Sequence, residues 1–109
     1  MKWLKHLYVG ESISEKEHKL KWKINHNAGT INVYVIAFAS NKANLLDVIP
    51  AAELLQKAYP KKDMHIIGLA RGYDEALELV RQIIEETYLA TGDVDVWTYL
   101  KNDRREKEG

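Results

Sequence analysis

Residues 64–92 constrain the fold of this chain more than any other segment. An apolar run at residues 64–70 meets Arg71 and Gly72, and a long amphipathic pattern follows directly and ends at Gly92. A short apolar run bounded by glycine is typical of a buried strand, and apolar residues at helical spacing are typical of a helix. We therefore predict a strand at 64–70, a tight turn and a helix at 73–91.

The predicted helix at 73–91 is amphipathic. Its outer face carries Glu78, Arg81 and Glu85 at the spacings that allow ion pairs within a helix. Acidic residues occupy its first turn, where they complement the helix dipole. The stripe predicted to face the core is formed by Ala76, Val80, Ile83, Thr87 and Ala90 and is widened by Leu77, Leu79 and Ile84.

Hydrophobic pattern and turn residues place the remaining elements. Residues 30–39 are rich in β-branched and aromatic side chains, which is typical of a central strand, and their second half is apolar on both faces. Pro50 fits the first turn of a helix, where its missing N–H costs nothing. The other predicted elements are strands at 6–10 and 45–49, a turn at 40–44, a helix at 51–58, a loop at 59–63 and a short final helix after Asp95.

Residues 13–27 allow two interpretations. Residues 12–15 match the S-x-x-E capping box, and Gly29 follows the segment as a C-terminal glycine should. Residues 19–24 instead alternate between lysine and apolar side chains, which is typical of a half-buried strand, with 26–29 as its hairpin turn. The capping box and the glycine favour the helix, which we adopt. It would bury one face formed by Ile13, Leu20 and Ile24.

Together these elements predict a single α/β-type (α+β) domain over residues 1–101. The order β-α-β-β-α-β-α indicates a two-layer sandwich with a mixed sheet of three or four strands, and it resembles the ferredoxin-like order with an added helix. Residues 102–109 mix charges and contain no apolar side chain, so we predict a disordered tail there.

Composition bounds the class of protein. Hydrophobic residues make up 46% and charged residues 29% of the 109 residues, which is usual for a soluble globular domain. The chain contains no cysteine, which excludes disulfides and cysteine-based metal sites and fits a reducing compartment. The longest apolar run, residues 33–39, is far shorter than the roughly 20 residues of a membrane helix, and the N-terminal residues show no signal-peptide pattern. We expect a cytoplasmic protein that does not enter a membrane.

The charges are balanced but unevenly distributed. The 16 basic and 16 acidic residues give a formal net charge of zero, which permits self-association. Residues 1–27 carry six lysines against three glutamates, whereas residues 71–95 carry two arginines against seven acidic residues. A chance distribution of charged residues over two solvent-exposed faces explains this asymmetry. The alternative is that the two faces are complementary and meet in a dimer. Large aromatic residues, which favour interfaces when exposed, are also numerous: Trp3, Tyr8, Trp22, Tyr59, Tyr73, Trp97 and Tyr99.

The turn formed by Arg71, Gly72 and Tyr73 is the candidate ligand site. Ligands of open α/β sheets bind beyond the carboxyl ends of strands, and helix N-termini hold anions. Arg71 and the amides near Gly72 therefore suggest a phosphate or carboxylate. Asp74 and Glu75 would repel such a ligand, however, and the structural interpretation is a glycine N-cap followed by an acidic first turn.

The sequence contains few candidate catalytic residues. None of the three serines lies in a G-x-S-x-G motif, and the four histidines lack metal-binding spacing. Asp63 and His65 share a face of a strand but are only two ligands. Glu85 and Glu86 are adjacent on a helix and point in different directions, so they do not form an acid/base pair. We predict no catalytic residue, metal or cofactor and favour a protein that is not an enzyme.

Residues 16–23 are the candidate nucleic-acid site. Lys19, Lys21 and Lys23 could contact phosphates, and Trp22 could stack on a base. As a helix the segment scatters these lysines around its axis, and as a strand it places Trp22 on the face opposite the lysines. A solvated lysine face is therefore the preferred interpretation, and the neutral net charge also argues against a nucleic-acid binder.

Four stretches, LYVGESI, NVYVIAFASN, NLLDVIP and IIGLARGYDEALELV, resemble a family of small uncharacterised proteins from clostridial-type bacteria. The resemblance extends from Leu7 to Leu100 and implies a bacterial cytoplasmic setting. It assigns no function to any residue. The sequence predicts a homodimeric interaction or regulatory module. An anionic-ligand binder that uses the Arg71–Gly72 turn and a weak nucleic-acid binder are the two alternatives.

Overall fold

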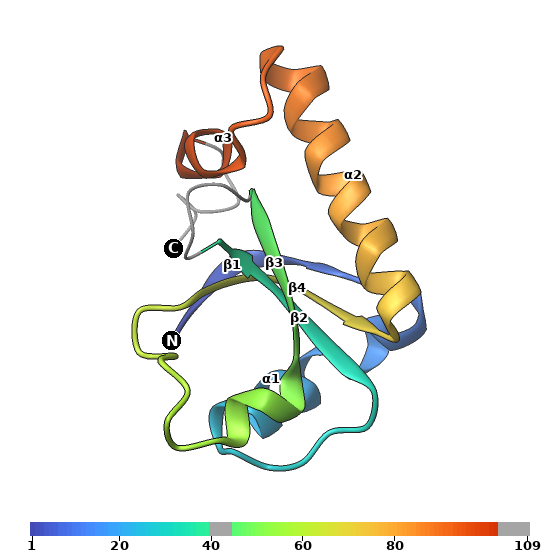
Figure 1. Ribbon diagram of the computed structural model, residues 1–109. Coiled ribbons are helices and arrows are strands. Elements are labelled where there is room, and N and C mark those ends of the chain that lie inside the picture. The colour runs from blue at the N-terminus through green and yellow to red at the C-terminus, as the bar shows by residue number, and fades with distance from the viewer. Residues whose placement is uncertain (40–44, 103–109) are drawn as a thin grey trace.

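The computed structural model describes residues 1–39 and 45–102 and contains a four-stranded mixed sheet (Figure 1). The strands are β1 (Lys2–Val9), β2 (Val33–Phe38), β3 (Leu46–Pro50) and β4 (His65–Arg71). Their order across the sheet is β1-β4-β2-β3. β1 runs parallel to β4, whereas β2 is antiparallel to both β4 and β3. β4 and β2 are therefore the central strands, and β1 and β3 form the edges.

Helices pack against both faces of this sheet. They are η1 (Glu11–Lys16), α1 (Glu17–Asn25), η2 (Ala51–Leu55), α2 (Tyr73–Thr91) and α3 (Val96–Asn102), where η denotes a 3-10 helix. One apolar cluster joins α2 and α3 to Ile36 and Ile67 of the sheet. A second joins η1, α1 and η2 to Val35 and Leu69. Val35 and Ile36 are successive residues of β2 and point to opposite faces, and a register shift at Ile67 of β4 keeps Ile67 and Leu69 on different faces. The two sets of helices lie on opposite sides of the sheet (Figure 1).

The predicted α+β class, mixed sheet and element order are confirmed by this architecture. The parallel pairing of β1 with β4 distinguishes the sheet from a ferredoxin-like one, which is antiparallel throughout. The likeness to that fold is therefore limited to the order of elements along the chain.

Residues 11–25 are helical, so the hairpin interpretation is wrong and the prediction of a helix in this segment is confirmed. η1 continues directly into α1, and the predicted face of Ile13, Leu20 and Ile24 is buried against the sheet. The predicted ends of this helix are wrong. Gly10 is the N-cap of η1, and the backbone reverses after α1 at Asn27, whose φ is 55°.

β1 and β2 also differ from the prediction at their starts. β1 begins at Lys2 instead of residue 6, because Lys2 and Trp3 already pair with the first residues of β4. β2 begins at Val33 instead of residue 30, because Asn32 has a φ of 56°, which interrupts an extended strand.

η2 is shorter than the helix predicted at 51–58. It ends at Leu55 because Gln56 takes an extended conformation with φ −73° and ψ 129°. The predicted turn at 40–44 and the tail from residue 103 onward lie outside the described residues.

α2 has the bounds that the sequence predicts. Gly72 is its N-cap with a φ of 84°, and Gly92 is its C-cap in the left-handed conformation that glycine adopts without strain. The buried stripe consists of Ala76, Leu79, Ile83 and Thr87. The Thr87 hydroxyl donates a hydrogen bond to the Ile83 carbonyl (2.8 Å), which satisfies the one polar side chain of the stripe.

Four residues of α2 differ from the predicted stripe. Val80 and Ile84 are only partly buried, and Leu77 and Ala90 are exposed. Val80 and Leu77 lie on the flank of the helix, away from its contact line with the sheet. Ala90 is exposed because the last turns of α2 project beyond the sheet (Figure 1). The predicted final helix is α3, and Asp95 caps it by accepting hydrogen bonds from the Thr98 amide (3.2 Å) and hydroxyl (2.7 Å).

The packing of α2 gives a direct test of the fold. Ile83 is 0% exposed and Leu89 is 77% exposed on the same helix. Ile83→Ala should lower the free energy of unfolding by about 2–5 kcal/mol, because it leaves a cavity between α2 and the sheet. Leu89→Ala, the matched control, should change it by less than about 0.5 kcal/mol. Denaturant unfolding followed by circular dichroism measures both, and equal losses would contradict the placement of α2.

Candidate functional site

The Arg71–Gly72 turn lies between the end of β4 and the start of α2. Its amide groups already have partners within the chain. The Arg71 N–H donates a hydrogen bond to Glu75 Oε1 (2.9 Å), and the Gly72 N–H donates one to the Asn32 carbonyl (2.7 Å). An anionic ligand at this turn would therefore have to compete with existing acceptors.

Glu75 fills the position that the sequence suggests for an external anion. Its carboxylate also accepts hydrogen bonds from the Ser12 hydroxyl (2.8 Å) and amide (3.3 Å). This contact explains why the predicted Ser12 cap is wrong, since the hydroxyl is directed to α2 instead of to its own helix. Gly10 permits the approach, because a Cβ atom at that position would overlap the Glu75 carboxylate.

The electrostatics around Glu75 also disfavour a ligand anion. Burial raises the pKa of Glu75, but the hydrogen bonds from Arg71 and Ser12 and the charge of Arg71 outweigh it, so the pKa is lowered. The adjacent groove, of about 450 Å³, is lined by Glu11, Asp74 and Glu78 as well as Glu75. A ligand anion would thus meet a cluster of carboxylates.

The three predicted ligand residues do not converge on one site. Arg71 is half-buried, and its Nε has no hydrogen-bond partner among the described residues. Tyr73 is exposed, and its ring contacts the ring of Tyr34 with 5.7 Å between centroids. Gly72 serves as the N-cap of α2. These contacts fit the structural interpretation of the turn, and the ligand-binding role of Arg71, Gly72 and Tyr73 stays a prediction.

The three predicted nucleic-acid lysines are divided between two sides of α1. Lys19 and Lys23 are four residues apart and share a face with Trp22, which is 58% exposed and stacks on His26 with 4.2 Å between ring centroids. Lys21 lies on the other side, with its Nζ 5.4 Å from the Trp3 ring centroid. The helix therefore places two lysines beside an aromatic side chain, whereas the sequence predicted that a helix would scatter the lysines around its axis.

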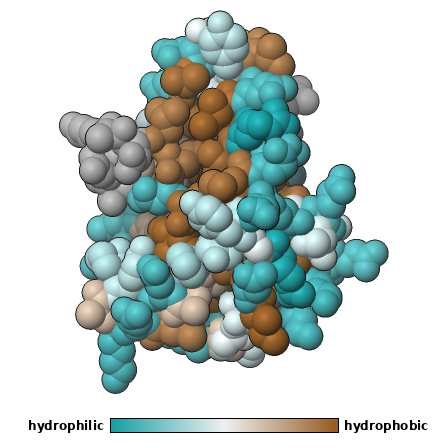
Figure 2. All heavy atoms as spheres, turned by 45° about the vertical axis from the view of Figure 1, so that its right-hand side comes forward, coloured by the Kyte–Doolittle hydropathy of each residue, from teal (hydrophilic) through white to brown (hydrophobic). Residues whose placement is uncertain are grey.

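A continuous apolar surface lies beside α2. α2 and α3 leave part of their face of the sheet open over β2 and β3, where apolar side chains are only partly buried. Figure 2 shows hydrophobic residues gathered in a band on this side of the molecule. We call it the α2–β3 surface, and it consists of Tyr34, Phe38, Leu46 and Val48 from the strands and Tyr73, Leu77, Val80 and Ile84 from α2.

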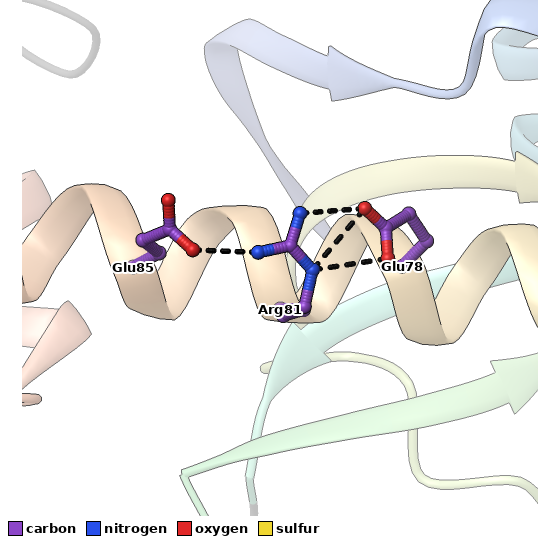
Figure 3. Close-up of polar contacts among 3 residues, drawn as sticks. All are labelled: Glu78, Arg81 and Glu85. Atoms are coloured by element: carbon purple, nitrogen blue, oxygen red, sulfur yellow. Dashed lines mark hydrogen bonds and ion pairs between the residues drawn. The ribbon is translucent and has the colours of Figure 1, made fainter.

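The outer face of α2 is charged and largely neutralises itself. Arg81 donates hydrogen bonds to Glu78 (2.6 Å) and Glu85 (2.5 Å), as Figure 3 shows. The hydrogen bond and charge of Glu78 and the charge of Glu85 raise the pKa of Arg81 above its ordinary value. These groups are exposed, so the pairs stabilise the helix little. The main effect of these charged side chains is to keep the outer face of α2 exposed to solvent.

Glu85 and Glu86 point apart, as predicted. Glu85 faces solvent and pairs with Arg81. Glu86 is half-buried and accepts hydrogen bonds from the hydroxyls of Tyr8 (2.6 Å) and Tyr99 (2.7 Å) at the same carboxylate oxygen. Glu86 therefore ties β1 and α3 to α2 and has a structural role.

A second groove, at the end of the sheet, was not predicted from the sequence. Its volume is about 480 Å³, and three aromatic rings from β2, β4 and α3 lie in its wall. Asp63 and His65, which the sequence places on one face, both line it, but Phe38, Asp47 and Trp97 come from distant segments with no common spacing. No local signal in the sequence could have joined them.

Comparison with protein-family models, curated proteins and solved structures gives no match to this chain. The resemblance to a clostridial-type family and the cytoplasmic setting therefore stay predictions. Among the described residues, no cluster of three or more metal-ligating side chains occurs. No helix in the same part of the chain is long and apolar enough to cross a membrane.

The position of Glu75 predicts a pH dependence of stability. Because its pKa is lowered in the folded protein below the ordinary value of 4.5, the carboxylate stabilises the fold above that pH, and this contribution is lost as the pH falls through the folded pKa. Glu75→Gln should lower the free energy of unfolding by roughly 1 kcal/mol at neutral pH, since the site is partly exposed.

Denaturant unfolding at several pH values between about 7 and 2 tests this prediction. The difference between wild type and Glu75→Gln should be constant above the ordinary glutamate pKa and should shrink at lower pH. Asp74→Asn, a neighbouring exposed carboxylate with its own side chain outside the Ser12 contact, is the matched control. A difference that grows as the pH falls would contradict the assignment.

Proposed function

We propose that the protein is a homodimeric interaction module that self-associates through the α2–β3 surface. The main observation in support is the band of partly exposed apolar side chains that joins α2 to two adjacent strands. Monomeric proteins seldom expose contiguous apolar areas of this kind, which usually mark interaction sites. Aromatic residues such as Tyr34 and Tyr73 are also enriched at protein interfaces.

The geometry suits a second copy of the same chain. A twofold dimer brings the same surface of each copy together, so an apolar flank of α2 can pack against its equivalent. The formal net charge of zero removes long-range repulsion between copies. Arg81 pairs with Glu78 and Glu85 within one helix, which leaves these three side chains with one net negative charge and so reduces the repulsion between two copies.

β3 adds a second means of association. It is an edge strand and pairs only with β2 among the described residues. The backbone groups on its outer side can bond to an edge strand of another chain. Val48 and Leu46 of this strand belong to the α2–β3 surface, so side-chain packing and strand pairing would occur in one interface.

Light scattering at about 50 mM and 500 mM salt tests the proposal. A mass near twice 12.6 kDa at both salt concentrations would support an apolar interface, because screening weakens exposed charge pairs and leaves apolar contacts intact. If the protein is monomeric at both salt concentrations, up to a protein concentration of about 100 µM, the dissociation constant of any dimer lies above that concentration. This result would overturn the proposal.

Leu77→Arg should convert the dimer to a monomer, because it places a charge within the α2–β3 surface at a residue that is 44% exposed in the single chain. The expected loss of affinity is about tenfold or more. Leu89→Arg, on the outer face of the same helix, should leave the dimer intact. Equal effects of the two substitutions would show that the interface lies elsewhere.

A second candidate function is weak binding of single-stranded nucleic acid by α1. Its support is the exposed Trp22, which stacks on His26 and lies on the same face of α1 as Lys19 and Lys23. A base can stack on an exposed ring while lysines contact phosphates. The neutral net charge ranks this candidate below the first.

Fluorescence anisotropy with a labelled single-stranded oligonucleotide tests the second candidate. Affinity should fall steeply with salt, and Trp22→Ala and the pair Lys19→Glu with Lys23→Glu should each weaken it by about tenfold. Lys21→Glu, on the opposite side of α1, is the control and should have a small effect. An affinity that is insensitive to salt and to these substitutions would exclude α1 as the binding site.

A further inference from the structure

A third groove, of about 550 Å³, lies between the end of α1 and the segment that leads from η2 to β4. Its volume is within the range of roughly 300–1,000 Å³ that ligand pockets occupy. We call it the basic groove, and its polar side chains are those of Asn25, Asn27, Lys57, Tyr59, Lys61 and Lys62. Each of these side chains can donate a hydrogen bond.

Three lysines give the basic groove a positive charge. Lys57 and Lys62 are exposed, and no carboxylate in the described part of the chain pairs with either of them. Lys61 is half-buried, and its Nζ donates hydrogen bonds to Asn27 Oδ1 (2.5 Å) and to the Leu54 carbonyl (2.8 Å). Both acceptors are uncharged, so the charge of Lys61 is not neutralised and its third N–H is available to a ligand.

The two asparagines offer N–H groups to a ligand because their oxygen atoms already accept hydrogen bonds. Asn25 Oδ1 accepts one from the Trp3 indole N–H (2.9 Å), and Asn27 Oδ1 accepts one from Lys61. An indole N–H and an ammonium group can only donate, so they determine which atom of each amide is the oxygen. The Nδ2 groups of Asn25 and Asn27 are therefore the polar atoms that remain for a ligand.

Acidic side chains do not line the basic groove. None of the described residues in its lining is acidic, and Asp63 lines the neighbouring groove together with Lys2. Burial raises the pKa of the Tyr59 hydroxyl, and the negative charges of Glu53 and Asp47 raise it further, so this hydroxyl stays protonated and uncharged. The three lysines of the lining outnumber these two carboxylates, so the potential in the groove is positive.

We propose that the basic groove binds a small anion that carries two or more phosphate groups. Phosphate oxygens only accept hydrogen bonds, so they match a lining of ammonium and amide donors, and several phosphate charges match several lysines. A cation would be repelled, and a neutral ligand would leave the lysine charges without a counter-charge. The groove shares no residue with the α2–β3 surface or with Lys19, Trp22 and Lys23 of α1, so this binding is independent of both proposed functions.

Inorganic pyrophosphate and orthophosphate are a matched pair of probes, since they differ in the number of phosphate groups. Titration in a phosphate-free, metal-free buffer at constant ionic strength can be followed by proton–nitrogen correlation spectra. The side-chain amide signals of Asn25 and Asn27 should shift and saturate with pyrophosphate, and orthophosphate should bind about tenfold more weakly or less tightly still. The signal of Asn32, which lies beside Gly72 at the other end of β4, should not shift.

Equal affinity for the two probes would overturn the proposal. So would the absence of a saturable shift at Asn25 and Asn27 up to about 10 mM pyrophosphate, a concentration above the millimolar range of weak specific binding.

Two isosteric substitutions test the donor groups. Asn25→Asp and Asn27→Asp each keep an oxygen for the existing hydrogen bond but replace the Nδ2 donor by a negative charge. Each should weaken pyrophosphate binding about tenfold or more. Asn32→Asp is the matched control, because Asn32 has a φ of 56° and Asn27 has one of 55°. It adds the same charge at the same backbone conformation, away from the groove, and should leave the affinity unchanged.

Lys57→Gln and Lys62→Gln remove one positive charge each at exposed residues. Each should weaken pyrophosphate binding about threefold to tenfold. Unchanged affinity in both groove aspartate variants would show that pyrophosphate binds elsewhere and would overturn the proposal. An equal loss in Asn32→Asp would show that binding follows only the net charge of the protein, and this result would also overturn it.

Discussion

The burial of β4 on both faces is the constraint on which the rest of the structure depends. Five consecutive residues of this strand are buried, among them Ile66, Ile67 and Leu69 with no exposed surface. A strand that is apolar on both sides needs a paired strand at each edge and a layer of side chains above and below. β1 and β2 provide the pairing, α2 and α3 cover one face, and the three short helices cover the other.

α2 converts this arrangement into distinct surfaces, because each side of the helix meets a different environment. Its buried stripe packs on the sheet, and its outer face holds the ion pairs of Arg81. The flank toward β1 carries Glu75 and Glu86, which bind groups on the N-terminal part of the chain. The flank toward β3 carries Leu77 and other apolar side chains that no described segment covers fully. This last flank gives the domain an apolar surface that is available for association.

Local signals predicted much of the fold. The bounds of α2 were correct because Gly72 and Gly92 act on the backbone within one turn of the helix. The buried face of α1 was correct because a helical period is visible within a few residues. The predicted cap at Ser12 failed for the opposite reason, since its hydroxyl bonds to Glu75, which is 63 residues away. The sequence indicated less about the candidate sites than about the fold, because a site depends on side chains from several elements.

The sequence by itself determined the class of the domain, the strand and helix of residues 64–92 and the balance of charge, because these depend on residue type and short-range periodicity. Only the tertiary structure decided the sheet order, the use of Glu75 as an internal anion and the meeting of Phe38, His65 and Trp97 at one end of the sheet. These features arise from contacts between segments that are far apart in the chain. Contacts of that kind leave no periodic signal in one sequence, because the pattern around each residue reflects only the helix or strand to which that residue belongs.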